Sequence, residues 1–303
     1  MNPPIPIQNL AAENLAGVRL THPEKIFYPA QRITKRDLAE YFEQMAPRLL
    51  PYVTRRPLSL VRCPQGHLRG CFFQRHPSAG MPRSFHAVRI PGTRHEPYIY
   101  VNSAGGLIAA AQLGALELHL WGSRIDDIEH PDRLIFDIDP DPDVAFSEVK
   151  RAARLLRDIL MSASLKSFVM LTGGKGLHVV VPLKGSNDWP EVKAFSQGIA
   201  SALAKSHPER YLAKANKQQR KGRIFIDWMR NMRSSTAIAP WSTRAREGCP
   251  IAVPVDWAEL ARIKRADQYQ LRNIGQRLKT LKHDPWAGYF QLRQQIPRTT
   301  LTL

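Results

Sequence analysis

The sequence has very little cysteine. Cys63, Cys71 and Cys249 are its only three cysteines in 303 residues. Three are too few for the disulfide framework that stabilises small secreted domains, so the chain is expected to depend on a hydrophobic core. This cysteine usage fits a reducing compartment, and we expect the protein in the cytoplasm.

Long hydrophobic runs are also missing. No stretch of about 18 or more apolar residues occurs, so there is no candidate transmembrane helix and no membrane partner is expected. Residues 1–10 contain three prolines and no basic segment ahead of an apolar one, unlike a signal peptide. There is no internal repeat and no clear linker. We therefore predict a flexible leader over residues 1–17 and a single domain over residues 18–303.

Acidic residues are scarce relative to basic ones. The sequence has 44 Lys and Arg against 26 Asp and Glu, which gives a net charge of +18 and a pI near 10.2. Because the basic residues are dispersed along the chain, they predict a basic folded surface with a polyanionic partner such as nucleic acid. The alternative is a solvated basic protein with no nucleic-acid role.

The periodicity of apolar residues predicts both helices and strands. Helices are expected at residues 35–50, 107–113, 144–161 and 189–205. Strands are expected at residues 58–62, 71–75, 98–101, 117–121, 134–139, 167–171, 177–182, 224–227 and 236–241. Since helices and strands do not alternate strictly, the pattern favours an α/β or α+β fold with mixed or antiparallel central sheets flanked by helices.

Two aspartates stand out at the end of an apolar strand, in residues 134–143 (LIFDIDPDPD). Side chains alternate faces along a strand, so Asp137 and Asp139 are expected side by side, with Ile138 in the core. Two adjacent carboxylates are favoured by a cation between them, and a hard divalent metal suits oxygen ligands. The alternative is an acidic turn in which Asp141 or Asp143 caps the next helix.

Asp227 also follows a short apolar strand, residues 224–227. Three carboxylates from two strand ends would suit a two-metal site for phosphoryl or nucleotidyl transfer. Taken alone, Asp227 is better explained as a structural or surface acid, and its value comes from sharing the strand-end context of Asp139.

A glycine-rich turn, residues 172–178 (TGGKGLH), separates two predicted strands. Its glycines allow positive φ angles, and its exposed N–H groups can form an anion-binding nest, to which Lys175 adds a charge. It is not a P-loop, because the spacing differs and no helix follows. A hairpin turn with a solvated lysine is the alternative. His178 could donate to a phosphate, although a single histidine near apolar residues is more often structural.

Further candidate residues lie on either side of these motifs. His119 falls between Leu118 and Leu120 in a strand, so it must face away from them, toward a cleft or solvent. Guanidinium groups suit phosphate, and four arginines flank Asp227 and the next strand: Arg230, Arg233, Arg244 and Arg246.

Two adjacent aromatic residues, Phe72 and Phe73, lie among basic residues. They predict a platform on which a nucleic-acid base stacks, with one of the pair in the core because neighbouring strand residues face opposite ways. A zinc site is an alternative for the nearby cysteines and histidines, but its C-x3-H-x3-C-x4-H spacing does not match common structural zinc sites. Its four candidate ligands are Cys63, His67, Cys71 and His76.

Together these motifs resemble the polymerase/primase domain of bacterial DNA ligase D, in the archaeo-eukaryotic primase superfamily. The resemblance spans about residues 20–286. Its motifs, in chain order, are LTHPEK at 20–25, YP at 28–29, TK at 34–35, FFQRH at 72–76, HLW at 119–121, DIDPDP at 137–142, TGGKGLH at 172–178, Asp227 with RN at 230–231, and RAREG at 244–248.

The resemblance implies a primase-polymerase fold and a role for each matching residue. The metal-binding carboxylates, for two Mn²⁺ or Mg²⁺ ions, would be Asp137, Asp139 and Asp227. The incoming nucleotide would be held by Thr172, Lys175, Gly176, His178 and Arg244, with His119 and Arg230 near the nucleotide and metal. Thr172 stands where the family usually has serine, and its hydroxyl is expected to keep the role. Phe72 or Phe73 would stack on a base, and Lys25 and Lys35 would hold a DNA 5′-phosphate.

The resemblance also implies a function. It indicates a DNA-dependent nucleotidyltransferase that fills gaps and extends ends in non-homologous end joining, by a two-metal mechanism and with a preference for ribonucleotides. Residues 116–250 would form the catalytic core and the N-terminal part would bind DNA. Expected partners are gapped or broken DNA, NTP or dNTP, and a ligase domain or separate ligase with the Ku protein. We expect a monomer associated with the bacterial nucleoid.

Two alternatives from other functional classes remain. One is a non-catalytic nucleic-acid-binding module, which would not need three carboxylates beside a Gly-Lys-Gly turn. The other is a two-metal nuclease, in which that turn would have no triphosphate to hold. The chain contains no ligase-type nucleotidyl-lysine architecture, so it would be either an excised domain or a stand-alone paralogue.

Overall fold

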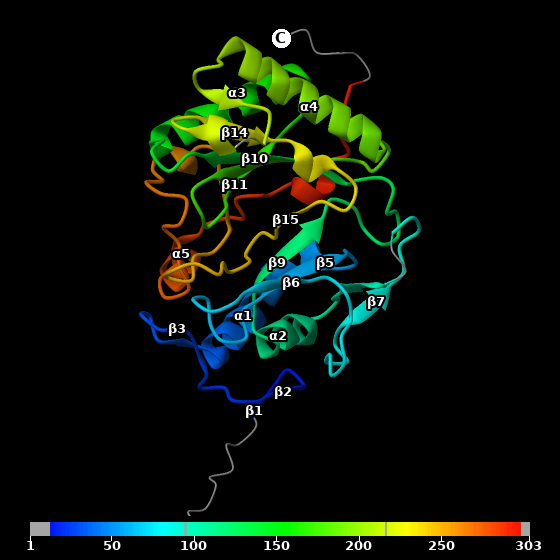
Figure 1. Cartoon of the computed structure of the whole chain (residues 1–303), viewed down its shortest axis with the longest axis vertical. Helices are drawn as coiled ribbons and strands as arrows, with labels where there is room; N and C mark the ends of the chain where they lie inside the picture. Colours follow the sequence, from blue (N-terminus) through cyan, green and yellow to red (C-terminus); the bar gives the residue numbers. More distant parts are fainter. Residues whose placement is uncertain (1–12, 94–95, 216, 298–303) are drawn as a thin grey trace, which may run out of the picture.

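Two β-sheets face each other across the middle of the molecule, and helices cover their outer sides (Figure 1). The computed structural model describes residues 13–93, 96–215 and 217–297. The mixed α/β architecture confirms the predicted fold class. Among the described helices, none combines the length and apolar character needed to cross a membrane.

The upper sheet in Figure 1 has six strands in the order β13-β14-β10-β12-β11-β16. All neighbouring pairs are antiparallel except β13 and β14, which are parallel. Its strands are β13 (Tyr211–Leu212), β14 (Ile224–Asp227), β10 (Arg133–Pro140), β12 (Leu177–Pro182), β11 (Phe168–Leu171) and β16 (Val253–Val255). Helices α3 (Phe146–Ser162) and α4 (Trp189–Ser206) cover its outer face.

The lower sheet has four antiparallel strands in the order β15-β9-β5-β6. These strands are β15 (Thr236–Ile238), β9 (Ala115–Trp121), β5 (Leu58–Arg62) and β6 (Phe72–Gln74). Helices α1 (Lys35–Val53) and α2 (Ala104–Gln112) pack beneath it. Leu118 and Leu120 of β9 are buried on the helix side, which leaves His119 on the side facing the upper sheet, as predicted.

Three short hairpins and several short helices complete the fold. The hairpins pair β1 (Glu13–Leu15) with β2 (Val18–Leu20), β3 (Ile26–Tyr28) with β4 (Ile33–Thr34), and β7 (His86–Val88) with β8 (Tyr98–Tyr100). The C-terminal part contains helix α5 (Ile274–Thr280). Strand β1 lies inside the predicted leader, whose residues 1–12 are outside the described part of the chain.

Helix α1 shows how local sequence sets an element. The Thr34 hydroxyl accepts the backbone N–H of Asp37, and the Asp37 carboxylate accepts the backbone N–H of Thr34 at 2.7 Å. This reciprocal capping box satisfies two N–H groups that a helix start leaves unpaired. The helix begins at Lys35 as predicted but continues to Val53, beyond the predicted end at Leu50, because Tyr52 and Val53 are buried in the core.

The acidic turn after β10 does not cap the next helix. Helix α3 begins after Ala145, which makes no side-chain cap. Asp141 instead accepts the backbone N–H of Asp143 at 3.2 Å, within the turn. The prediction that Asp141 or Asp143 caps this helix is therefore wrong.

Cys63 and Cys71 form a disulfide that joins the residue after β5 to the residue before β6. The remaining cysteine, Cys249, is buried and free. The disulfide consumes both sulfur ligands of the zinc alternative, and no metal-binding group of three or more His, Cys, Asp or Glu side chains occurs in residues 13–93, 96–215 and 217–297. The zinc interpretation is therefore wrong.

Candidate active site

A polar cavity of about 220 Å³ opens between the two sheets. Both sheets contribute to it, along with the loops that follow β11 and β15. Its lining includes nine of the predicted site residues: His119, Asp137, Asp139, Thr172, Lys175, Gly176, His178, Arg230 and Arg244. The fold thus brings together residues that lie up to 125 positions apart in the sequence, from 119 to 244.

The three predicted carboxylates lie on two neighbouring strands, β10 and β14. Asp137 and Asp139 both line the cavity while Ile138 between them is fully buried, as strand alternation predicts. Asp227 is the cross-strand partner of Asp137. The side chains of Asp137 and Asp227 are 17% and 9% exposed, against 45% for Asp139.

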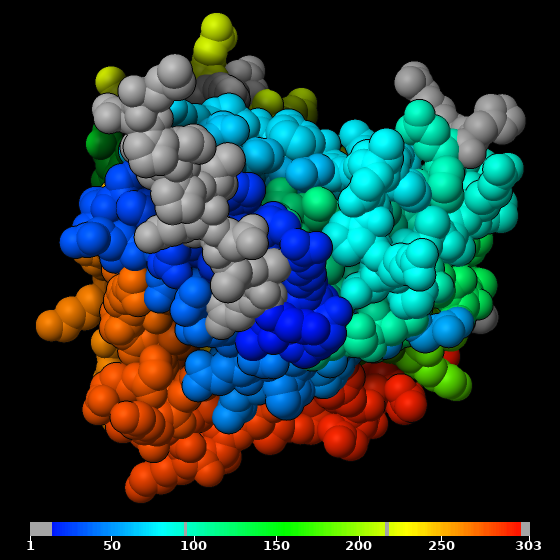
Figure 2. All heavy atoms as spheres, turned by 90° about the horizontal axis from the view of Figure 1, so that it is seen from below, coloured from blue at the N-terminus to red at the C-terminus, as the bar shows by residue number. Residues whose placement is uncertain are grey.

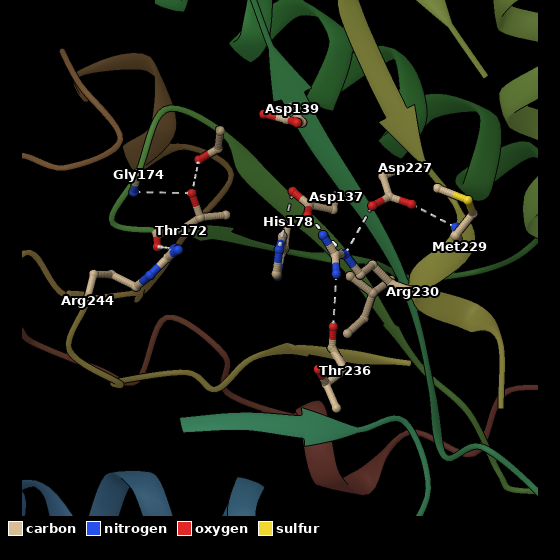
Figure 3. Close-up of polar contacts among 12 residues, drawn as sticks. Asp137, Asp139, Thr172, Gly174, His178, Asp227, Met229, Arg230, Thr236 and Arg244 are labelled. Atoms are coloured by element: carbon tan, nitrogen blue, oxygen red, sulfur yellow. Dashed lines mark hydrogen bonds and ion pairs between the residues drawn. The ribbon is translucent and has the colours of Figure 1, made fainter. Parts of the chain in front are cut away.

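Basic side chains already contact each of these carboxylates, and Figure 3 shows the contacts of Asp137 and Asp227. Arg230 lies between two of them, with Nε 3.2 Å from Asp137 and 3.1 Å from Asp227. Arg220 pairs with Asp139 at 2.6 Å. Among the residues that the structure describes, no group of three or more His, Cys, Asp or Glu side chains is arranged as a metal-binding cluster.

The pKa of Asp137 is shifted in the opposite direction from the pKa values of Asp139 and Asp227. Burial raises the pKa of Asp137, but the nearby His178, Arg230 and Arg244 outweigh it and hold that pKa well below its usual range. Burial, followed by repulsion from Asp137, raises the pKa of Asp139 despite Arg220. Burial also raises the pKa of Asp227. The Arg230 charge opposes this rise, and repulsion from Asp137 adds to it.

This donor set fits a divalent cation. Carboxylate oxygens are the ligands that Mg²⁺ and Mn²⁺ prefer. Asp137 and Asp139 on β10 line the cavity, and Asp227 on β14 is the cross-strand partner of Asp137. The repulsion that raises the pKa of Asp139 and Asp227 would be relieved by a cation between the carboxylates. Asp137, Asp139 and Asp227 are therefore the residues that could hold a metal.

The glycine-rich turn connects β11 to β12 at the side of the cavity. The Thr172 hydroxyl donates to the Gly176 carbonyl at 2.9 Å and accepts the Gly174 N–H at 3.3 Å (Figure 3). Its hydrogen bonds therefore shape the loop. At Gly176 an added Cβ would lie 2.1 Å from the Ile138 carbonyl oxygen, so only glycine fits against the strand that carries the aspartates.

Basic side chains surround this turn. Arg244 donates to the Thr172 carbonyl at 2.5 Å and is largely buried, whereas Lys175 and Arg246 are exposed. His178, on β12, is the cross-strand partner of Asp137, and its Nε2 lies 3.4 Å from that carboxylate. His178 thus contacts the carboxylate group directly, in addition to facing the cavity.

Sequence reasoning missed Glu117, a buried carboxylate two positions before His119 on β9. One oxygen of Glu117 lies 2.7 Å from His119 Nε2, and the other lies 3.1 Å from Arg244 Nε. The signal that could have found it was the strand alternation, which places Glu117 and His119 on one face.

The two phenylalanines differ from the prediction, because both are exposed, Phe72 by 46% and Phe73 by 66%. Strand β6 is at the edge of the lower sheet, so its outer side has no further strand to cover it. Phe73 pairs with Val61, which in turn pairs with Glu117, so Phe73 is on the same face of the sheet as Glu117 and His119. The ring centroids of Phe73 and His119 are 6.0 Å apart, in an edge-on arrangement. Phe72 packs under the Arg62 guanidinium, whose Cζ lies 5.3 Å from the centroid of the Phe72 ring.

Lys25 and Lys35 lie together, away from this cavity, in a second pocket that also includes His22 and Glu24. Lys25 donates to Gln65 at 3.1 Å, and Lys35 donates to the Thr21 carbonyl at 2.5 Å. Burial and the neighbouring Lys25 lower the pKa of Lys35. Two ammonium groups so close favour an anion. Figure 2 shows the molecule from below the view of Figure 1, where the blue N-terminal segment lies between cyan and orange parts of the chain.

Comparison with known proteins gives consistent matches. A family model described as "LigD, primase-polymerase domain" matches residues 34–286. The chain is 38% identical over 291 residues to the multifunctional non-homologous end joining protein LigD of Pseudomonas aeruginosa, covering 93% of this chain and 34% of that protein. It is 31% identical over 254 residues to the protein of the same name from Mycolicibacterium smegmatis, covering 82% of this chain and 33% of that one.

A solved structure supports the same comparison. The polymerase domain from Mycobacterium tuberculosis ligase D in complex with DNA superposes with a TM-score of 0.81 at 29% identity, covering 86% of this chain and 94% of that one. The chain spans about a third of the length of the Pseudomonas and Mycolicibacterium relatives.

Proposed function

The chain belongs to the LigD primase-polymerase family, and from this premise we propose that it adds nucleotides to DNA 3′ ends during repair by non-homologous end joining. Three kinds of finding support the proposal: the family model, relatives named for non-homologous end joining, and a matching polymerase domain whose structure holds DNA. The net charge of +18 agrees with a nucleic-acid partner.

The observation that carries the proposal is the division of charge across one cavity. Asp137 and Asp139 line it on β10, with Asp227 beside Asp137 on β14, and the glycine-rich turn and Arg244 line it as well. A nucleoside triphosphate needs both, because its phosphates bind basic groups and N–H donors while its divalent cations bind carboxylates. A nuclease would have no use for the turn, and a DNA-binding module would have no use for buried carboxylates.

In the proposed reaction a DNA 3′-hydroxyl attacks the α-phosphate of the nucleotide and pyrophosphate leaves. Two divalent ions, Mn²⁺ or Mg²⁺, would neutralise phosphate charge and lower the pKa of the attacking hydroxyl when bound by the three aspartates. Arg244 and Lys175 would hold the triphosphate against the N–H groups of the turn. Thr172 and Gly176 would keep the turn in shape for that contact.

The remaining predicted residues receive roles from their positions. His178 and Arg230 contact Asp137, so they would orient that carboxylate beside the nucleotide. Of the two phenylalanines, Phe73 faces the cavity and would stack on a base, while Phe72 would support the edge of the platform. Lys25 and Lys35 would hold a 5′-phosphate in their separate pocket.

We extend the proposal to the wider context of the protein. Residues 18–303 would act as one catalytic domain, with the N-terminal part on the DNA and residues 116–250 as the catalytic core. The enzyme would prefer ribonucleotides and work as a monomer at the bacterial nucleoid. It would act with a ligase domain or separate ligase and with Ku, since the matched relatives are named as multifunctional end-joining proteins.

The test is primer extension on DNA with a one-nucleotide gap and a 5′-phosphate, comparing NTP with dNTP and Mn²⁺ with Mg²⁺. The proposal predicts a primer one nucleotide longer, formed faster with NTP and with Mn²⁺. Tight gap binding without extension would favour a binding module, and a shortened primer would favour a nuclease.

A further inference from the structure

Glu117 is a carboxylate that the roles above leave unused, and it contacts two residues that line the cavity, His119 and Arg244. It is 6% exposed, and each of its oxygens has a partner. Oε2 lies 2.7 Å from His119 Nε2, and Oε1 accepts the Ala245 backbone N–H at 2.9 Å while lying 3.1 Å from Arg244 Nε. Its partners therefore come from β9 and from the loop after β15.

The charge state of Glu117 decides which nitrogen of His119 carries the proton. Burial raises the pKa of Glu117, but the His119 hydrogen bond and the Arg244 charge outweigh it and lower that pKa to about 2. An ionised carboxylate can only accept hydrogen bonds, so His119 Nε2 must be the donor. Burial lowers the pKa of His119, and the charges of Arg244 and Arg230 lower it as well. Glu117 raises this pKa, but the net shift is downward. The imidazole is therefore neutral near pH 7, and its Nδ1 is left as an acceptor.

Arg244 is fixed by a set of contacts in which Glu117 provides the only negative charge among those the structure records for its side chain. Its guanidinium also donates to the Thr172 carbonyl at 2.5 Å, and its backbone carbonyl accepts the Tyr28 hydroxyl at 2.7 Å. The Glu117 carboxylate therefore lies at ion-pair distance from a guanidinium that contacts the turn proposed to receive the triphosphate. Figure 3 shows the contact between Arg244 and Thr172 of that turn.

We infer that Glu117 is a positioning residue for the nucleoside triphosphate, because it orients Arg244 toward the phosphates and holds His119 with Nδ1 as an acceptor for a substrate hydroxyl. This inference rests on the proposed function, since it assigns a nucleotide to the cavity. Glu117 itself does not touch the nucleotide. The residues that would do so are Arg244 and His119, and both depend on one buried carboxylate for their geometry.

The decisive substitution is Glu117→Gln, which keeps the shape of the side chain. The amide oxygen can replace one carboxylate oxygen as a hydrogen-bond acceptor, whereas the NH₂ group can only donate. The negative charge that attracts Arg244 is lost. We expect the KM for the nucleotide to rise about 10- to 100-fold, with a smaller fall in kcat. DNA affinity and the midpoint of thermal unfolding should stay close to the wild type.

A matched control is Glu259→Gln. Glu259 is also a partly buried carboxylate paired with an arginine, Arg277, in a pocket of the C-terminal region away from the site. Its substitution should lower stability and leave the nucleotide KM unchanged. If both variants raise KM equally, the effect on the site is general loosening and the inference fails.

Two further readouts separate positioning from a purely structural role. In a double-mutant cycle, Glu117→Gln should add little to Arg244→Ala if it acts through Arg244, whereas independent effects would be additive. The ¹⁵N shifts of the His119 ring, assigned with His119→Asn, should report the Nε2–H tautomer in the wild type and a mixture in Glu117→Gln. Additive effects together with an unchanged tautomer would overturn the inference.

Failure of this inference can be told apart from failure of the proposed function. Binding of a fluorescent ribonucleoside triphosphate is measured without DNA, so it does not depend on extension. If the wild type extends primers and Glu117→Gln binds the nucleotide normally, only the role of Glu117 is wrong. If the wild type neither binds nucleotides nor extends primers, the proposed function and the inference that rests on it are both wrong.

Discussion

Asp137 and His178 face each other across β10 and β12, and His178 Nε2 lies 3.4 Å from Asp137 Oδ1. The pair joins two motifs that are about 40 residues apart in the sequence and places an imidazole beside the most acidic of the three carboxylates. The glycine-rich turn leads directly into β12, the strand that carries His178. The position of the turn relative to the carboxylates is thus set by the β10–β12 register.

The carboxylates are expected to be required for catalysis but not for DNA binding. Asp139→Asn removes a ligand of the proposed cations while keeping the side-chain shape, so extension should fall by about 1,000-fold or more. Gap affinity, measured by fluorescence anisotropy, should change little because the proposed 5′-phosphate contacts, Lys25 and Lys35, lie in a separate pocket. Retained extension in this variant would contradict the metal assignment. Asp137→Asn should behave alike, with a further loss of stability because His178 and Arg230 lose their partner.

Gly176 is expected to tolerate no side chain. The Cβ of Gly176→Ala would meet the Ile138 carbonyl oxygen at 2.1 Å and push on the strand that carries Asp137 and Asp139. We expect a loss of about 2 kcal/mol or more in the free energy of unfolding, together with a loss of extension. Gly198→Ala is the matched control, since Gly198 lies in α4 with no atom within 4 Å of the added Cβ. That variant should gain about 0.5–1 kcal/mol and keep full activity.

Lys25 is expected to distinguish DNA by its 5′-phosphate. Lys25→Ala should weaken binding to a phosphorylated gap and reduce the slope of log K against log salt by about one, because one phosphate contact is lost. Binding to the unphosphorylated gap should be nearly unchanged, and an equal loss on both substrates would remove the assigned role. Lys25 is a better test than Lys35, whose ammonium also holds the Thr21 carbonyl. Lys205→Ala, on the exposed side of α4, is the control.

Asp37 is expected to make stability depend on pH at the start of α1. Burial raises its pKa, but hydrogen bonds from Thr34 and the Arg272 guanidinium outweigh burial and leave the pKa lowered. A lowered folded-state pKa stabilises the fold above the unfolded value, near 3.9, and this stabilisation is lost as pH falls through the folded value. Asp37→Asn should therefore cost about 1 kcal/mol at pH 7 in urea unfolding. The difference from wild type should shrink at pH 3, and a constant difference would contradict the linkage.

The sequence predicted much of the fold, and nine of the residues it singled out line one cavity. Strand alternation was enough to put Asp137 and Asp139 on one face, and the Thr34 cap was enough to start α1. What could not be predicted depended on contacts between distant segments. Strand alternation places Glu117 on the same face as His119, but its ion pair with Arg244 forms only because the loop after β15 brings Arg244 to it. Phe72 and Phe73 are both exposed because β6 is an edge strand, which depends on sheet order.

The disulfide and the pairing of Arg220 with Asp139 were also not predictable from the sequence. Cys63 and Cys71 are eight residues apart, and their pairing depends on how the loop between β5 and β6 folds back. Arg220 comes from a basic segment with no distinctive motif, and its contact with Asp139 follows from the β14–β10 pairing.

The central claim is that the cavity between the two sheets transfers a nucleotide to a DNA 3′ end. It is tested most directly by incubating the wild type with a 5′-phosphorylated one-nucleotide gap, one complementary NTP and Mn²⁺, and then analysing the products by mass spectrometry and a pyrophosphate assay. The account predicts a primer heavier by one nucleotide and one pyrophosphate released per primer extended, with neither product from Asp139→Asn. An unchanged or shortened primer, with no pyrophosphate, would contradict it.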